Sequence, residues 1–122
     1  MKKQTSNLIS NIGICGAFDF KSYGDLLFPL IAEKELTKRL GAINIHPFSY
    51  HKKSPPEWCY KVTSLTELPE KISSLDGVLI GGGHIIRFDK FIPPGYLPSN
   101  PDIHYPTGFW LIPTLLALQH GI

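Results

Sequence analysis

Short apolar runs alternate with longer amphipathic segments along this chain. Four short runs predict strands that are buried or half-buried, at residues 11–17, 42–48, 60–63 and 76–80. Three longer segments predict helices, at residues 24–40, 64–74 and 107–120. Strands that alternate with helices are typical of a parallel sheet with helices packed on it. The pattern therefore predicts an α/β protein, and 122 residues suffice for one such domain.

The first helix has the clearest periodic signal. Its apolar stripe repeats at helical spacing, at Phe28, Ile31, Ala32, Leu36 and Leu40. Further leucines surround its first half, at Leu26, Leu27 and Leu30. We therefore expect that half to be the more deeply buried one. Gly41 provides the stop signal, because glycine readily adopts a positive φ.

The predicted strand order leaves one edge of the sheet open. Right-handed crossovers arrange the strands in the order 3-2-1-4, so residues 11–122 form a Rossmann-like open parallel sheet with flanking helices, after a lead-in at 1–10. The unbroken apolar run at 76–80 predicts a strand covered on both faces. The chain ends where a further strand would begin beside it. We therefore expect an incomplete N-terminal piece of a longer protein, whose open edge pairs with a second copy when isolated.

Composition and charge narrow the classes of function. The net charge is only +2, and the basic residues are scattered, with only short adjacent pairs such as Lys2-Lys3 and Lys52-Lys53, which predicts no nucleic-acid-binding stripe. The longest apolar stretch, 109–118, is too short to span a bilayer, and no apolar signal-peptide region follows Met1. These features predict a cytoplasmic protein without a membrane span.

Cysteines and isolated histidines offer little chemistry in this sequence. Cys15 lies inside a predicted buried strand, and its spacing from Cys59 fits neither a redox motif nor a metal site. Free thiols are therefore expected at both positions. His46 and His120 have no distinctive partners in the sequence, and no cluster of ligating side chains predicts a metal.

Two glycine-bearing turns follow neighbouring strands of the predicted sheet. Residues 22–25 (Ser-Tyr-Gly-Asp) come after strand 11–17, and residues 81–84 (Gly-Gly-Gly-His) come directly after strand 76–80. In an open parallel sheet, ligands bind beyond the carboxyl ends of the strands where the strand order reverses. Neither turn matches the dinucleotide or Walker glycine patterns. The turns therefore predict a crevice whose backbone N–H groups bind an anion or a sugar hydroxyl.

Side chains near these turns provide candidates for chemistry, each with a structural alternative. Asp25 is a candidate base, or a partner for the positive end of the helix dipole. His84 is a candidate for proton transfer near neutral pH, or bonds a loop carbonyl. Arg87 is a candidate for binding carboxylate or phosphate, or forms an ion pair with Asp89 or Asp19.

Taken in order, these segments resemble the polysaccharide pyruvyl transferase family. Gly16 and residues 22–27 (Ser-Tyr-Gly-Asp-Leu-Leu) are similar to the family's Asn-x-Gly-Asp turn after the first strand, with Ser22 in place of Asn. Residues 75–83 (Leu-Asp-Gly-Val-Leu-Ile-Gly-Gly-Gly) are similar to its Asp-x-apolar-Gly-Gly-Gly strand end. The apolar helix at 108–121 is similar to the one that leads to the next strand. The resemblance covers about residues 11–122.

The resemblance implies a function and a larger architecture. It implies two Rossmann-like domains facing a cleft, as in the glycosyltransferase-B fold, with this chain as part of the first. It implies transfer of pyruvate from phosphoenolpyruvate to hydroxyls of a glycan or lipid-linked sugar, giving a ketal or enolpyruvyl ether, with no cofactor. The catalytic candidates are then Asp25 and His84. The substrate-binding candidates are Ser22, Gly24, Gly81, Gly82, Gly83 and Arg87. The alternative is a non-catalytic sugar- or nucleotide-binding module with the same half-fold.

Overall fold

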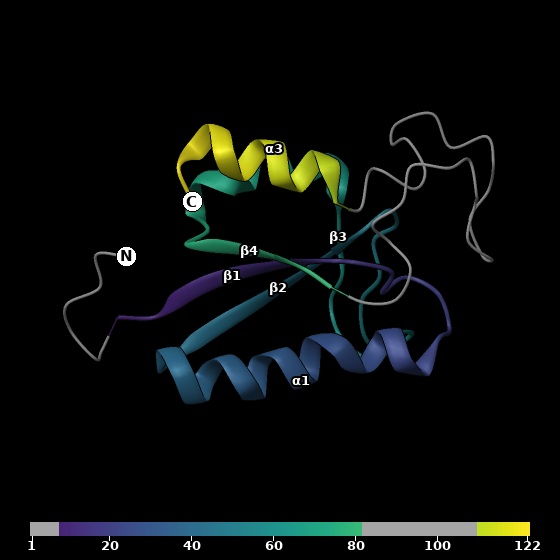
Figure 1. Ribbon diagram of the computed structural model, residues 1–122. Helices are drawn as coiled ribbons and strands as arrows, with labels where there is room; N and C mark the ends of the chain where they lie inside the picture. The colour runs from purple at the N-terminus through teal and green to yellow at the C-terminus, as the bar shows by residue number, and fades with distance from the viewer. Residues whose placement is uncertain (1–7, 82–109) are drawn as a thin grey trace.

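The predicted sheet and strand order are confirmed by the computed structural model, which describes residues 8–81 and 110–122. Four parallel strands form one sheet in the order β3-β2-β1-β4 (Figure 1). The strands are β1 (Ser10–Cys15), β2 (Ile43–Ser49), β3 (Thr63–Ser64) and β4 (Gly77–Ile80). Central strand β1 pairs with β2 on one side and with β4 on the other, and β4 is an edge strand of the sheet that the described residues form.

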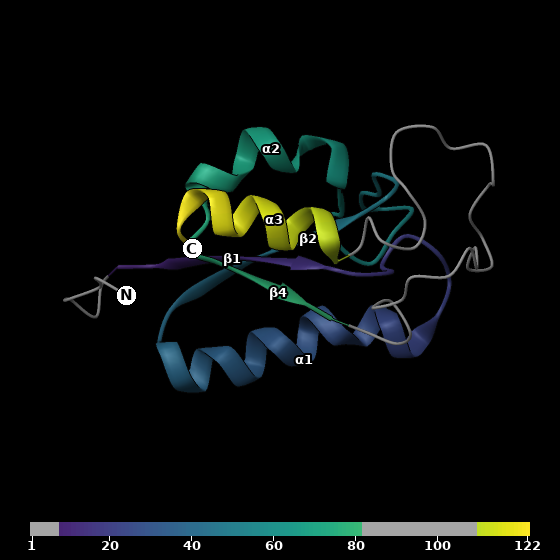
Figure 2. The same cartoon turned by 45° about the horizontal axis from the view of Figure 1, so that its top comes forward.

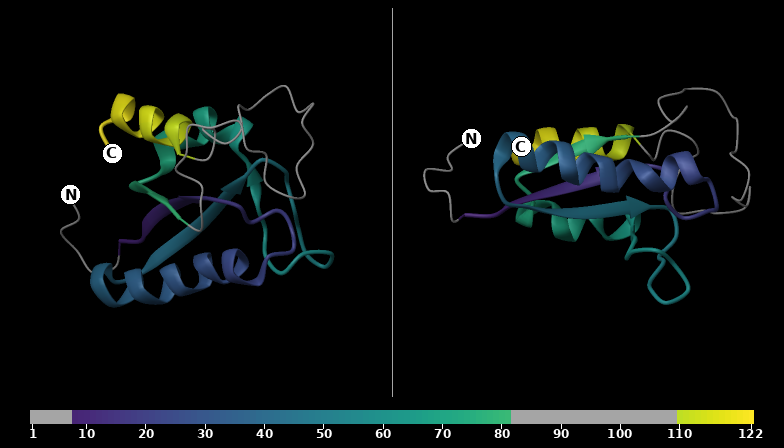
Figure 3. Two further views of the ribbon diagram at one scale, coloured as in Figure 1. Left: turned by 45° about the vertical axis from the view of Figure 1, so that its right-hand side comes forward. Right: turned by 90° about the horizontal axis from the view of Figure 1, so that it is seen from below.

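Helices cover the two faces of the sheet (Figure 2). One face carries α1 (Tyr23–Leu40), and the other carries α2 (Leu68–Lys71) and α3 (Leu111–His120), an arrangement that two further views confirm (Figure 3). Short 3-10 helices, η1 (Leu65–Glu67) and η2 (Ile72–Ser74), flank α2. Within the described ranges, none of these helices has the length and apolar character needed to cross a membrane.

Alternate side chains of β1 enter two separate cores, as the strand's period of two requires. On the α1 side, Ile12 and Ile14 pack with Ala32 of the helix and with Phe18 and Val62. On the α2 and α3 side, Cys15 belongs to a cluster of eight buried residues. The others are Ala17, Phe48, Tyr50, Leu65, Leu68, Ile72 and Leu75. Both cysteines are free thiols, and burial raises the pKa of the Cys15 thiol.

The predicted helix ends are confirmed where glycine stands. Gly41 ends α1 with φ 83°, and its N–H donates to the Thr37 carbonyl. Gly121 ends α3 in the left-handed conformation at φ 68° and ψ 32°. At the start of η1, the Ser64 side chain accepts a hydrogen bond from the Thr66 N–H, as expected for a cap.

Two expectations about burial are wrong. In the first half of α1, Leu27 and Leu30 are each 51% exposed, and only Pro29 and Ala32 of the helix are buried. One face of α1 contacts the sheet, so the leucines on its outer side stay in solvent. Strand β4 is half-buried along its whole length instead of fully covered, because it lies at the edge of the sheet.

The third strand is shorter and later than predicted. The sequence predicts a strand at 60–63, whereas β3 spans Thr63–Ser64. The reason is local pairing: Val62 exchanges two backbone hydrogen bonds with Lys53, at 2.8 and 3.0 Å, in an isolated antiparallel bridge. The preceding residues therefore pair with their own loop and not with β2.

Strands β1 and β4 end side by side at two glycines. The Gly81 N–H donates to the Cys15 carbonyl at 3.0 Å, and the Gly16 N–H donates to the Phe48 carbonyl at 3.1 Å. A Cβ atom on Gly16 would collide with the Gly81 carbonyl oxygen, and one on Gly81 would collide with the Phe28 ring. Close backbone approach therefore favours glycine at position 16, and packing of the Phe28 ring favours it at position 81.

We expect Gly16→Ala to lower the free energy of unfolding by about 1–3 kcal/mol, because backbone atoms must move apart to admit the methyl group. Gly24→Ala is the matched control, since Gly24 is exposed and a Cβ there meets nothing within 4 Å. Urea unfolding of both variants checks this expectation. Equal stability of Gly16→Ala and wild type would contradict the close approach.

Candidate functional site

The carboxyl ends of β1, β2 and β4 lie at one edge of the parallel sheet, where binding sites of such sheets form. The loop at 16–22 leaves β1 at this edge and leads into α1. Residues 50 and 51 follow β2 there, and Gly81 follows β4. The predicted adjacency of the first and fourth strands is thus confirmed, and their ends meet at Gly16 and Gly81.

The structure describes part of the predicted set of site residues. Ser22 is the residue before α1, and its side chain makes no capping hydrogen bond. Gly24 is exposed, and Asp25 is half-buried in the first turn of α1. The other candidates lie outside the described residues and stay predictions, namely Gly82, Gly83, His84 and Arg87. The roles of Ser22, Gly24, Asp25 and Gly81 stay predictions as well.

A buried carboxylate and a histidine form a pair at the same edge. Asp19 Oδ2 accepts hydrogen bonds from the His51 backbone N–H at 2.8 Å and from His51 Nδ1 at 2.9 Å. The Asp19 side chain is fully buried, whereas that of His51 is 41% exposed. An ionised carboxylate can only accept, so the Nδ1 atom carries the proton in this contact. In neutral His51 the Nε2 atom is then the proton acceptor.

Three hydrogen bonds hold the loop that carries Asp19. Ser49 Oγ accepts from the Phe18 N–H at 2.7 Å and donates to the Gly16 carbonyl. The Trp58 indole N–H donates to the Phe18 carbonyl at 2.9 Å. The Phe18 ring stacks on Phe28 of α1, with ring centroids 6.4 Å apart. Because Phe18 is fixed from the sheet, the loop and the helix, the neighbouring Asp19 is fixed as well.

The pair is not among the site residues that the sequence predicts. Asp19 enters there only as an alternative partner for Arg87, and His51 is not singled out. A usable signal is nevertheless present, because each residue closely follows one of two adjacent strands, β1 and β2. Asp19 and His51 therefore follow adjacent strand ends at the carboxyl edge of the sheet, as the glycine turns do.

His46 has a partner, contrary to the expectation from the sequence. It lies within β2, and its Nε2 atom is 3.1 Å from Asn11 Oδ1. Burial is the main cause that lowers the pKa of His46, and the charges of Lys71 and Lys61 lower it further. Since Gly13 of β1 is its neighbour in register, His46 belongs to the middle of the sheet and not to the carboxyl edge.

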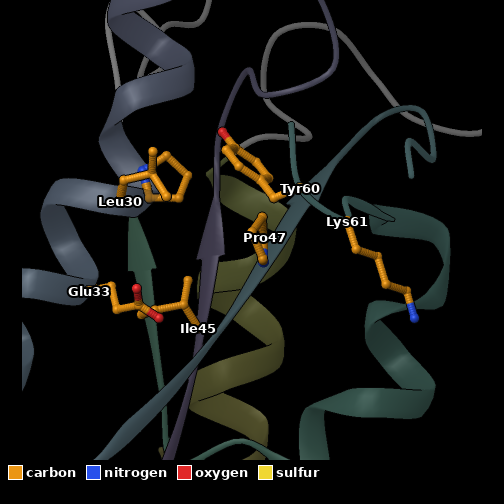
Figure 4. A pocket seen from close by; sticks show the side chains of 7 residues that line it. Leu30, Glu33, Ile45, Pro47, Tyr60 and Lys61 are labelled. Atoms are coloured by element: carbon orange, nitrogen blue, oxygen red, sulfur yellow. The ribbon is translucent and has the colours of Figure 1, made fainter. Parts of the chain in front are cut away.

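A cavity of about 190 Å³ lies between α1 and β2 (Figure 4). Its lining residues are Pro29, Leu30, Glu33, Ile45, Pro47, Tyr60 and Lys61. The Tyr60 hydroxyl donates to the Leu26 carbonyl at 2.8 Å, and burial raises its pKa, helped by Cys59 and Asp25. This cavity lies on the face that α1 covers, so it is distinct from the site that the strand ends predict.

Comparison with known proteins assigns no family. No protein-family model matches the chain, and no curated protein or solved structure matches it. In residues 8–81 and 110–122, no group of three histidine, cysteine or acidic side chains could hold a metal ion.

We expect Ser49→Ala to lower the free energy of unfolding by about 1–3 kcal/mol, because it removes the hydroxyl that bonds to both the Phe18 N–H and the Gly16 carbonyl and leaves them only their mutual hydrogen bond of 3.2 Å. Ser73→Ala is the control, since Ser73 is exposed. Denaturant unfolding measures both variants. A loss no larger than that of the control would contradict the bridging role of the hydroxyl.

We expect the stability of the protein to depend on the protonation of His46. Its folded pKa lies below the ordinary 6.5, so the unfolded chain binds more protons in mild acid. The stability that depends on neutral His46 is complete above the ordinary pKa of 6.5. It is lost as the pH falls from there through the lower folded pKa. In His46→Gln, urea unfolding at about pH 7.5 and about pH 5 should therefore show a smaller acid loss than in wild type. Identical losses would contradict this expectation.

Proposed function

We propose that this chain forms one wall of a cleft in which a pyruvyl group passes from phosphoenolpyruvate to the hydroxyls of a sugar. The observation that carries the proposal is the meeting of the β1 and β4 ends at Gly16 and Gly81, followed by the start of α1. This arrangement fits both motifs by which the sequence resembles polysaccharide pyruvyl transferases. It places the start of α1, whose first N–H groups have no partner within the helix, at the edge where anions and hydroxyls bind in parallel sheets.

The reaction is a substitution that needs no oxidant or reductant. A proton adds to the CH2 carbon of phosphoenolpyruvate and leaves an oxocarbenium-like centre at C2. The oxygen of a sugar hydroxyl forms a bond to C2 while a base takes its proton. The bond from C2 to the phosphate oxygen breaks, and phosphate leaves with that oxygen and the bonding electrons. A second hydroxyl then closes the ketal. The two hydroxyls together release two protons, which balance the proton added to the CH2 carbon and the proton that leaves with phosphate.

The residues of the carboxyl edge receive roles in this proposal. Asp25 and His84 are candidates for proton transfer, one at each turn. Arg87 is the candidate contact for an anionic group of the donor. Further contacts to hydroxyls or phosphate come from the turns, at Ser22, Gly24, Gly81, Gly82 and Gly83. A second Rossmann-like domain would supply the opposite wall and hold most of the donor phosphate.

A phosphate-release assay tests the proposal on the full-length protein. Phosphoenolpyruvate is supplied with a panel of sugars, lipid-linked sugars and glycans that carry suitably spaced hydroxyls. We expect release of phosphate that depends on the acceptor, with an acceptor mass increased by one pyruvyl ketal per phosphate. Binding of sugar or nucleotide without phosphate release would favour the non-catalytic module instead.

Substitution of the predicted residues tests their assignment separately. We expect Asp25→Asn or His84→Ala to lower kcat by about 10²–10⁴, the usual contribution of a positioned acid or base. The exposed Ser73→Ala variant is the control for handling and expression. If both substitutions kept wild-type turnover, the assignment of these two residues would be wrong.

A further inference from the structure

We propose that His51 takes the proton of the acceptor hydroxyl as a catalytic base and that Asp19 is its positioning residue. This inference rests on the proposed function and adds a pair of residues to it. The reaction handles protons at two places, the CH2 carbon of the donor and the hydroxyls of the acceptor. His51 therefore acts in addition to the candidates Asp25 and His84.

The hydrogen bonds of the pair set both the tautomer and the orientation of the imidazole. One carboxylate oxygen of Asp19 accepts from the backbone N–H and from the Nδ1–H of the same residue, at 2.8 and 2.9 Å. Two bonds to one oxygen fix the ring relative to its own main chain. The proton on Nδ1 places the basic lone pair on Nε2, which is the arrangement a general base needs.

Burial of the carboxylate keeps the pair in one geometry. The Asp19 side chain is fully buried, and its Oδ2 atom lies 2.9 Å from His51 Nδ1. The Phe18 anchors to Ser49 and Trp58 hold Asp19 in place, so the loop need not rearrange during the transfer.

The position of His51 suits an acceptor sugar. Its side chain is 41% exposed, and it follows β2 at the edge where the loop from β1 leads into α1. In the proposed step, Nε2 takes the hydroxyl proton as the hydroxyl oxygen bonds to C2 and the C2–phosphate bond breaks. The imidazolium then releases this proton to the departing phosphate, which leaves His51 neutral for the next cycle.

NMR of the histidine nitrogens in the full-length protein tests the tautomer without any substrate. We expect the His51 signals of the Nδ1–H form in wild type and their loss in Asp19→Asn, whose amide can donate to Nδ1. Assignment comes from His51→Gln. A neutral His51 that carries its proton on Nε2 in wild type would overturn the proposal, whatever reaction the protein catalyses.

Steady-state phosphate release tests the catalytic role. We expect His51→Gln to lower kcat by about 10²–10⁴ while the KM for phosphoenolpyruvate changes little, because the donor is not bound by this side chain. The variant keeps the backbone N–H that bonds to Asp19, which supports the loop. His120→Gln, an exposed histidine on α3, is the matched control with unchanged turnover. Added imidazole should restore part of the activity of His51→Ala, which a purely structural role would not allow.

The outcomes separate this inference from the proposed function. Wild-type turnover that His51→Gln retains would overturn the pair as a base and leave pyruvyl transfer standing. A loss in His51→Gln that appears only in KM would likewise overturn it. Absence of phosphate release from wild type with every acceptor would overturn the proposed function, and with it the role of His51 toward an acceptor hydroxyl. The tautomer measurement would still decide whether His51 has the geometry of a base.

Discussion

The ends of β1 and β4 lie so close that a side chain on Gly16 would collide with the Gly81 carbonyl oxygen. This contact depends on the strand order, because the order 3-2-1-4 puts β1 beside β4. It lies where the loop at 16–22 leaves β1, since Gly16 is the residue that meets the Gly81 carbonyl oxygen. The loop at 16–22 therefore begins from a fixed point.

The position of the Asp19–His51 pair follows from that fixed point. Ser49, the last residue of β2, binds the loop at both Gly16 and Phe18 through one hydroxyl. Asp19 is the next residue, and it reaches back to His51, just beyond the end of β2. A carboxylate and an imidazole 32 positions apart in the sequence are thus joined by the register of two parallel strands.

The fold could be predicted from the sequence because its determinants are local and periodic. Apolar runs and helix stops, such as Gly41 and Gly121, specify the elements, and the handedness of crossovers specifies their order. The burial of individual apolar residues on α1 could not be predicted in the same way. Apolar residues surround the first half of α1, so composition alone does not say which of them contact the sheet. Leu27 and Leu30 are half exposed because they lie on the outer side of the helix.

Side-chain chemistry was harder to predict than the fold, since it depends on which loop side chains meet. The sequence locates the carboxyl edge and predicts the Gly16–Gly81 neighbourhood, whereas the Asp19–His51 contact needs the rotamers of two loop residues. No periodic signal marks either residue. Asp25, by contrast, is detectable from sequence because its place in the first turn of a helix is a local property.

The loop at 16–22 connects the Asp19–His51 pair to the N-terminus of α1 at the carboxyl edge. Its first part carries Asp19 and is held at Phe18, and the carbonyl of its last residue, Ser22, accepts a hydrogen bond from the Leu26 N–H in the first turn of α1. A hydroxyl near His51 and an anion near the start of α1 would therefore contact opposite ends of the same short segment. Because Phe18 also stacks on Phe28 of α1, a displacement of the helix start is resisted by the residue that positions Asp19. The spacing between the Asp19–His51 pair and the N-terminus of α1 is thus maintained by packing around the Phe18 side chain.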